Sequence, residues 1–164
     1  MNQRRNKEKG FSLIELLIVV TIILIIAAIA IPNLMRNKIQ ANETAAVETM
    51  RTLNESILLY SNSYGGFPHA LSDMGPASGG ATAAATSAGA DLIDATLASG
   101  VKSGYKFAYT AVMTDPAGNV QSYTITATPV VPGSTGQRSF FTDQSGTIRN
   151  TSSGTADAAS APIS

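Results

Sequence analysis

The sequence has no cysteine, a single histidine and few charged residues, and these shortages limit the bonds, metal sites and partners that the chain can have. Without cysteine no disulfide can close a loop of the chain, so packing must stabilise the folded part. The lone histidine, His69, has no second histidine or cysteine with which to share a metal ion. We therefore assign His69 no role and predict neither a metal nor a cofactor.

Charge is scarce and balanced, with 11 basic and 11 acidic side chains. Four of the bases and one acid lie in residues 1–9, which leaves seven bases and ten acids in the rest of the chain. This mildly acidic remainder does not favour binding to nucleic acid. The sequence also lacks a nucleophile with a neighbouring base, a glycine-rich phosphate loop and paired loop carboxylates, so it does not indicate an enzyme.

What the sequence does contain is a long apolar run over residues 11–31. Within residues 16–31 every side chain is Leu, Ile, Val or Ala except Thr21, so a helix here has no polar face. Its 21 residues rise about 30 Å, the thickness of the bilayer core. The basic residues before the run predict a cytoplasmic amino terminus. Glu15, near the start of the run, is costly in lipid and is therefore a candidate functional residue.

Residues 9–17, Lys-Gly-Phe-Ser-Leu-Ile-Glu-Leu-Leu, closely resemble the processing and methylation motif of type IV prepilins and type II secretion pseudopilins. The resemblance covers the amino-terminal part of the chain through Pro32. It implies that a membrane-bound prepilin peptidase and methyltransferase cuts after Gly10 and methylates the new terminus at Phe11. It also implies that Glu15 pairs with the terminal amine of a neighbouring subunit.

Elementary electrostatics supports this role for Glu15. Cleavage after Gly10 creates an ammonium group on Phe11, and two opposite charges in a low-dielectric setting attract far more strongly than in water. Pairing between neighbouring helices would fix their axial register. A pair between Glu15 and the amine of the same chain is the competing interpretation. In a third interpretation Glu15 has no function and its side chain only reaches the membrane interface.

After Pro32 the pattern becomes amphipathic. Pro32 removes one helical hydrogen bond, which predicts a kink, and the helix is expected to continue to about Tyr64, where Gly65-Gly66 follows. We expect Glu43, together with other charged residues, on the opposite, solvated or subunit-facing side. The predicted buried stripe comprises Ile39, Ala46, Met50, Leu53, Ile57, Tyr60 and Tyr64.

The rest of the chain predicts loops and then strands. Residues 75–89 are poor in large apolar groups and indicate a flexible loop, whereas a short helix is expected from an Asp cap at Asp91. Alternating residues at 105–111 and 123–128, separated by a turn, predict a hairpin. A third strand is expected at 138–142 and a short fourth at 147–149. The aromatic row of the hairpin could form either the core or a ligand face, and the helix stripe favours the core.

These patterns together predict an α+β, pilin-like fold. A long amino-terminal helix, membrane-spanning in its first half and kinked at Pro32, packs against an antiparallel sheet of three to four strands. The expected segments are a cleaved leader (1–10), a membrane and filament-core helix (11–32), an amphipathic half (33–66), a loop with a short helix (67–102), a β-meander (103–149) and a loose tail (150–164).

Three functions remain open at this point. The favoured one is a structural subunit of a type IV pilus, an inner-membrane precursor that polymerises with other pilin subunits through the pilus assembly machinery into a cell-surface filament. A type II secretion pseudopilin in a periplasmic pseudopilus is the alternative; no calcium-loop cluster of acids is evident in the carboxy-terminal half, which favours the pilus. A signal-anchored binding domain would instead be cut near Ala30, or not at all.

Overall fold

The computed structural model describes residues 10–77 and 83–163. Within them the chain forms two compact units, one up to Asn37 and one from Lys38, and each is described by itself. Most of the predicted leader and the central part of the predicted flexible loop, residues 78–82, lie outside the described residues.

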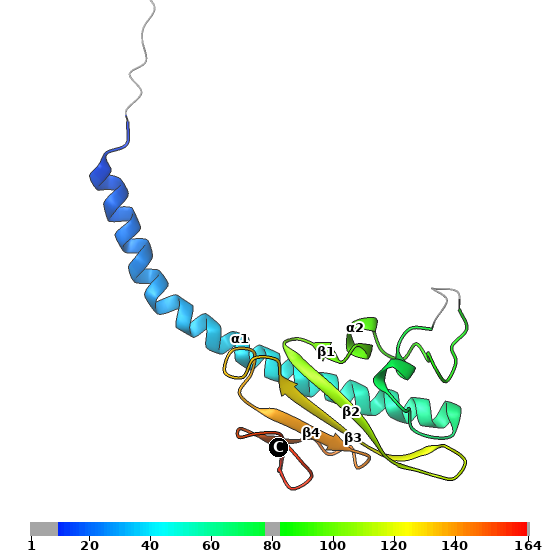
Figure 1. Cartoon of the computed structure of the whole chain (residues 1–164). Helices are drawn as coiled ribbons and strands as arrows, with labels where there is room; N and C mark the ends of the chain where they lie inside the picture. The colour runs from blue at the N-terminus through cyan, green and yellow to red at the C-terminus, as the bar shows by residue number, and fades with distance from the viewer. Residues whose placement is uncertain (1–9, 78–82, 164) are drawn as a thin grey trace, which may run out of the picture. The chain divides into compact units, whose positions relative to one another are not determined.

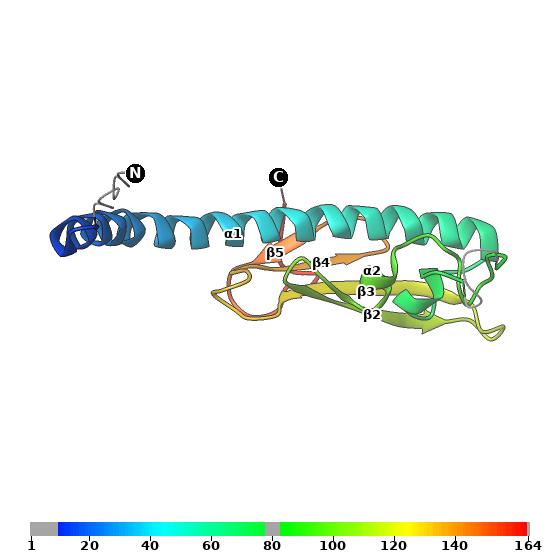
Figure 2. The same ribbon diagram turned by 90° about the horizontal axis from the view of Figure 1, so that it is seen from above.

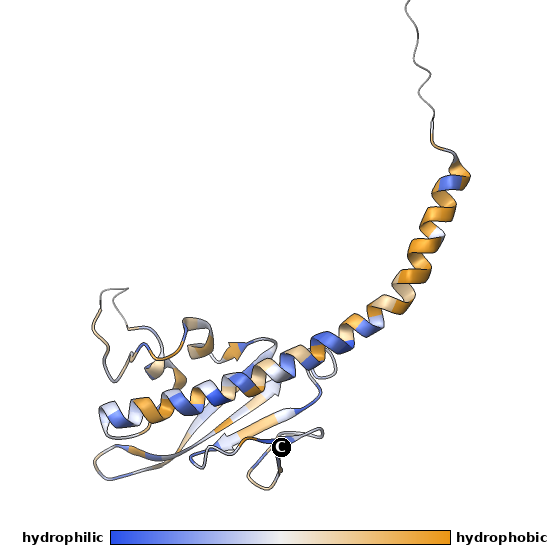
Figure 3. Cartoon of the chain, turned by 180° about the vertical axis from the view of Figure 1, so that it is seen from behind, coloured by the Kyte–Doolittle hydropathy of each residue, from blue (hydrophilic) through white to orange (hydrophobic). Residues whose placement is uncertain are grey.

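The helix α1, Leu13–Tyr64, supplies the first unit and one layer of the second (Figure 1). After Glu15 its first half is apolar through Ile31 except at Thr21, and its second half carries both polar and apolar residues (Figure 3). The helix continues through Pro32 without interruption. It ends at Tyr64, as the sequence predicts, because Gly65 adopts a left-handed backbone with φ of 79° and its amide bonds back to the Ser61 carbonyl.

The second half of α1 lies along one face of a six-stranded antiparallel sheet (Figure 2). The strands follow one another in chain order. They are β1 Val101–Lys102, β2 Tyr105–Thr114, β3 Val120–Pro129, β4 Ser139–Asp143, β5 Arg149–Thr151 and β6 Ala161–Pro162. The α+β class and the helix-on-sheet arrangement are therefore confirmed, and the sheet has two more short strands than the upper number predicted.

The predicted hairpin is formed by β2 and β3, with Tyr109 opposite Ile125. Its turn is closed by the Asp115 carboxylate, which accepts hydrogen bonds from the backbone amides of Ala117 and Asn119 at 2.9 and 2.8 Å. Asx residues hold turns in this way because their short side chains reach amides two to four residues ahead.

One core lies between α1 and the sheet. The predicted helix stripe faces it from Ala46 to Tyr64, whereas Ile39 is not part of this core. The aromatic row of the hairpin packs there, so the core interpretation of that row is confirmed. Each fully buried large apolar side chain contributes about 1.5–3 kcal/mol. The largest contributors are Met50, Leu53, Ile57, Tyr60, Tyr105, Phe107, Tyr123, Ile125 and Phe140.

Two short helices connect α1 to the sheet, the 3-10 helix η1, Leu71–Met74, and α2, Ala95–Ala98. The cap expected at Asp91 is wrong. Asp94 caps α2 by accepting the Leu97 amide at 2.9 Å, while Asp91 takes a left-handed backbone with φ of 52°. Two aspartates three residues apart offer the same cap signal, and burial of Ile93 and Leu97 selects the second.

The carboxy-terminal segment, expected to be a loose tail, is held on the sheet. Arg149–Thr151 and Ala161–Pro162 pair as β5 and β6, and Ala156 is buried. The Ser139 hydroxyl bonds the Gly154 carbonyl at 2.7 Å and accepts the Ala156 amide at 2.8 Å. Composition does not predict these contacts. A segment of small polar residues becomes ordered when a buried residue of another strand forms hydrogen bonds with its backbone.

We expect Ser139→Ala to release this segment. The substitution removes both hydrogen bonds and leaves the buried Ala156 amide unsatisfied, a cost of about 1–3 kcal/mol. Hydrogen exchange at Ala156 should speed up by about tenfold or more, while Ser153→Ala, which removes an exposed hydroxyl near the same turn, should leave it unchanged. Equal exchange in the two variants would show that Ser139 does not anchor the segment.

Candidate functional site

The start of the described chain presents the Gly10–Phe11 bond outside any helix. Both residues are exposed, and α1 begins two residues after Phe11. A side-chain carbon on Gly10 would meet no atom within 4 Å, and Gly10 does not have a positive φ. The fold therefore does not require glycine here, so a requirement for glycine must come from another molecule.

Glu15 lies in the first turn of α1, and its Oε2 accepts the Ser12 backbone amide at 2.9 Å. This is one half of a capping box, in which a glutamate satisfies an amide at the start of its own helix. Oε1 accepts no hydrogen bond from the described residues. The carboxylate thus holds the helix start with one oxygen, and among the described residues the other oxygen has no donor.

The side chains after Glu15 form a continuous exposed apolar surface. Within the described residues α1 is the one helix long and apolar enough to cross a membrane. Its only hydroxyl between residues 16 and 31, on Thr21, bonds the Leu17 carbonyl at 2.7 Å and so presents no unsatisfied group to lipid. An apolar surface of this extent needs a partner, either lipid or protein.

Glu43 does not lie where the sequence analysis predicts. The expectation of a solvated or subunit-facing side is wrong, because Glu43 is buried against the loop between β3 and β4. Its Oε1 accepts the Gln137 amide at 2.8 Å and the Arg138 amide at 3.2 Å, and its Oε2 pairs with the Arg138 guanidinium at 2.8 Å. The neighbouring Asn42 bonds the Thr135 carbonyl at 2.8 Å, so two successive helix residues clamp this loop.

The clamped loop also closes over the core. A side-chain carbon on Gly136 would lie 2.1 Å from the Tyr105 hydroxyl oxygen, so only glycine allows the loop to pass over this fully buried ring. The Tyr105 hydroxyl in turn donates to the Arg138 carbonyl at 2.8 Å. No local sequence pattern around Glu43 predicts these contacts, because its partners lie more than ninety residues away in the chain.

The other residues considered in the sequence analysis do not form a metal site within the described residues. Within residues 10–77 and 83–163 no set of His, Asp or Glu side chains could hold a metal ion. His69 is exposed, and its backbone amide donates to Asp73. Arg51 pairs with Glu48 at 2.9 Å on the exposed side of α1, as its spacing predicts.

The fold and the exposed apolar half-helix define an α+β protein with an amino-terminal segment suited to membrane anchoring. Residues 5–31 match the family model of the prokaryotic N-terminal methylation motif. This match confirms the amino-terminal resemblance to type IV prepilins and type II secretion pseudopilins.

The chain is similar to curated proteins of both branches. It is 41% identical over 70 residues to the type IV wide pilus major component PilA4 of Thermus thermophilus, a match that covers 41% of this chain and 53% of that protein. It is 36% identical over 55 residues to the type II secretion system core protein G of Escherichia coli, which covers 34% and 38% of the two chains. The matches thus span about half or less of each relative. No solved structure matches the chain.

Proposed function

We propose that the protein is a structural, non-enzymatic subunit of a type IV pilus. It is made as a single-pass inner-membrane precursor, cut after Gly10 by prepilin peptidase and methylated on Phe11. It then polymerises with other subunits through the inner-membrane assembly machinery, as its apolar helix exchanges lipid for the helices of its neighbours. Pro32 kinks the stem between its membrane and amphipathic halves.

The observation that carries this proposal is an exposed apolar half-helix together with a glutamate whose second oxygen accepts no hydrogen bond from the described residues. In lipid that carboxylate is costly, and the amine created on Phe11 is its natural counterion. Because Oε2 already binds its own helix start, Oε1 is the oxygen that faces the amine of a neighbour.

A pseudopilus subunit is the second candidate, supported by the similarity to the secretion core protein of Escherichia coli. The pilus is favoured because the similarity to the Thermus pilus component is higher in identity and covers more of both chains. The two candidates share the amino-terminal chemistry. They separate by location, since surface filaments sheared from cells contain a pilus subunit and leave a periplasmic pseudopilus behind.

Replacing Gly10 by leucine tests the processing step. We expect the Gly10→Leu chain to accumulate as uncut precursor in the inner membrane, with mature protein reduced by about a hundredfold, because a peptidase subsite that accepts glycine has no room for an isobutyl group. Mass spectrometry of the amino terminus measures this. Gly10→Ala is the control. A Cβ at position 10 meets no atom within 4 Å, and the position is exposed, so a difference between the two variants reflects recognition by the peptidase.

A wild-type protein that begins with methylated Phe11 supports the proposal. A native terminus near Ala30, or an intact leader on surface-exposed protein, would contradict it and favour the signal-anchored binding domain. Normal filament yield from Gly10→Leu would contradict it as well.

A further inference from the structure

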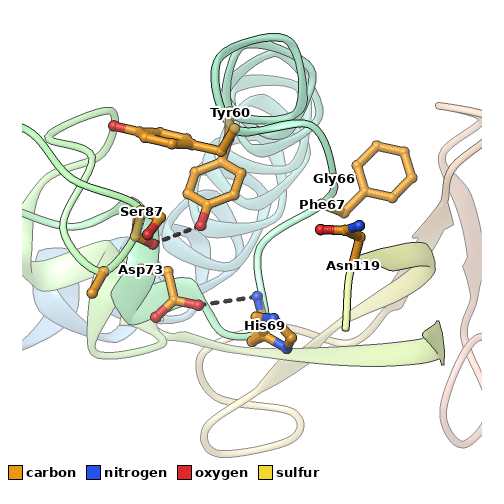
Figure 4. Close-up of a pocket in the computed structure, with 9 residues that line it drawn as sticks. Tyr60, Gly66, Phe67, His69, Asp73, Ser87 and Asn119 are labelled. Carbon is orange, nitrogen blue, oxygen red and sulfur yellow. Dashed lines mark hydrogen bonds between the residues drawn. The ribbon is translucent and has the colours of Figure 1, made fainter. Parts of the chain in front are cut away.

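A pocket of about 400 Å³ lies within the second unit, where α1 ends (Figure 4). Its walls come from segments far apart in sequence: the last turn of α1, the turn after it, η1, the loop at Ser87 and the β2–β3 turn. The volume is within the range of small-ligand sites, about 300–1,000 Å³. It is lined by Tyr60, Tyr64, Gly66, Phe67, His69, Asp73, Ser87, Ala88 and Asn119.

The aromatic part of the lining is held in place by contacts to the core. Tyr60 and Tyr64 lie one turn apart on α1 with their ring centroids 4.7 Å apart. The Tyr60 hydroxyl donates to the Ser87 carbonyl at 2.6 Å, which ties the helix to the opposite wall. Phe67 is fixed by its edge contact with Tyr123 and by the hydrogen bond of its amide to Val120. The rings are therefore preorganised and do not need to order on binding.

The charge of the lining is negative. Asp73 supplies its carboxylate, and no lysine or arginine is among these lining residues. Asp73 Oδ2 accepts the backbone amides of His69 and Ala70 at 3.0 Å each, so the carboxylate cannot swing away. Oδ1 accepts no hydrogen bond from the described residues. Figure 4 shows Tyr60, Asp73, His69 and Asn119 around one opening.

Aromatic faces next to a fixed carboxylate are the arrangement that binds organic cations. A ring face attracts an ammonium group electrostatically, and the attraction strengthens where water is excluded. A neutral ligand of the same shape would gain the same contact area without this attraction. An anionic ligand would be repelled by Asp73.

We propose that this pocket binds an organic ammonium group, which contacts the rings of Tyr60 and Tyr64, with Asp73 supplying the counter-charge. The site goes beyond the proposed role in a filament, and it does not depend on that role being correct. The ammonium group can be a methylated headgroup such as choline or the side chain of a lysine residue, and the experiment distinguishes these two sources.

Ligand-observed NMR on the full mature chain in a non-ionic detergent tests the proposal. The probes are choline, its uncharged isostere 3,3-dimethylbutan-1-ol (dimethylbutanol), and Nα-acetyl-lysine amide (acetyl-lysine amide), which keeps its ε-ammonium group. We expect choline or acetyl-lysine amide to bind about tenfold or more tightly than dimethylbutanol, and the tighter of the two identifies the source. Equal binding of choline and dimethylbutanol, or no binding of either cation, would overturn the proposal.

Two variants test whether the cation binds at Asp73 and Tyr64. Asp73→Asn keeps an acceptor oxygen for the His69 and Ala70 amides but removes the charge, and Tyr64→Leu removes a half-buried ring. Each should weaken cation binding about tenfold. Asp91→Asn is the matched control, because Asp91 is exposed, lies outside the lining and has a left-handed backbone that asparagine tolerates. Unchanged binding in Asp73→Asn, or equal loss in Asp91→Asn, would show that the cation binds elsewhere.

Discussion

Glu15→Gln is expected to reduce assembled filament by about a hundredfold while processing after Gly10 continues. In the proposed filament each carboxylate neutralises the amine of a neighbour in an apolar environment, and removing one partner of a buried pair costs about 3–5 kcal/mol. Glutamine keeps an amide oxygen that can accept the Ser12 amide, so the start of α1 is preserved. The loss is therefore electrostatic, and sheared-filament yield with mass spectrometry of the cellular pool measures it.

Thr21→Val is the control for Glu15→Gln. Thr21 is the other polar residue of the apolar half-helix, and its hydroxyl is satisfied within the helix by the Leu17 carbonyl. Filament yield should be unchanged in this variant. Normal yield from Glu15→Gln would show that Glu15 serves only as a helix cap, and a signal-anchored domain would likewise be indifferent to the substitution.

Glu43→Ala is expected to destabilise the second unit. The substitution leaves the amides of Gln137 and Arg138 without their acceptor and the Arg138 guanidinium without its counterion. Hydrogen bonds to a charged group contribute about 1.5–3 kcal/mol each, and Arg138 is partly exposed and so recovers some hydration. We expect a loss of about 3 kcal/mol in the free energy of unfolding, measured by denaturant titration of the mature chain in detergent.

Glu48→Gln is the matched control for Glu43→Ala. Glu48 lies on the same helix and also pairs with an arginine, but both side chains are largely exposed. Exposed pairs contribute at most about 1 kcal/mol, so Glu48→Gln should have little effect. Equal losses in the two variants would show that burial of Glu43 does not increase the contribution of its ion pair to stability.

The Glu43 contribution should also depend on pH. Burial of the carboxyl opposes ionisation, but the Gln137 amide, the Arg138 side chain and the Arg138 amide outweigh it and hold the pKa of Glu43 below its ordinary value of 4.5. The unfolded chain therefore takes up a proton first on acidification, and the stabilisation is lost as the pH falls through the folded pKa. The stability difference between wild type and Glu43→Gln should accordingly shrink below about pH 4.5 and stay constant above it. A difference that grows on acidification would contradict this assignment.

The elements that the sequence determined are those with strong local signals. Residues 16–31 have no polar face, so they could only be an apolar helix in lipid or in protein. Alternation in the hairpin and the stripe ending at Tyr64 each place one face in a core, and the glycine after Tyr64 ends the helix. These features follow from periodicity and backbone freedom, which neighbouring residues set.

Only the tertiary structure decided the contacts between distant segments. It buried Glu43 against a loop more than ninety residues away, chose Asp94 over Asp91 as a cap, and anchored the carboxy-terminal segment through Ser139. It also brought Tyr60 and Asp73 to one pocket. The physical reason is the same in each case: a polar side chain is placed by the backbone groups and charges it meets on folding, and neither composition nor local periodicity specifies those partners.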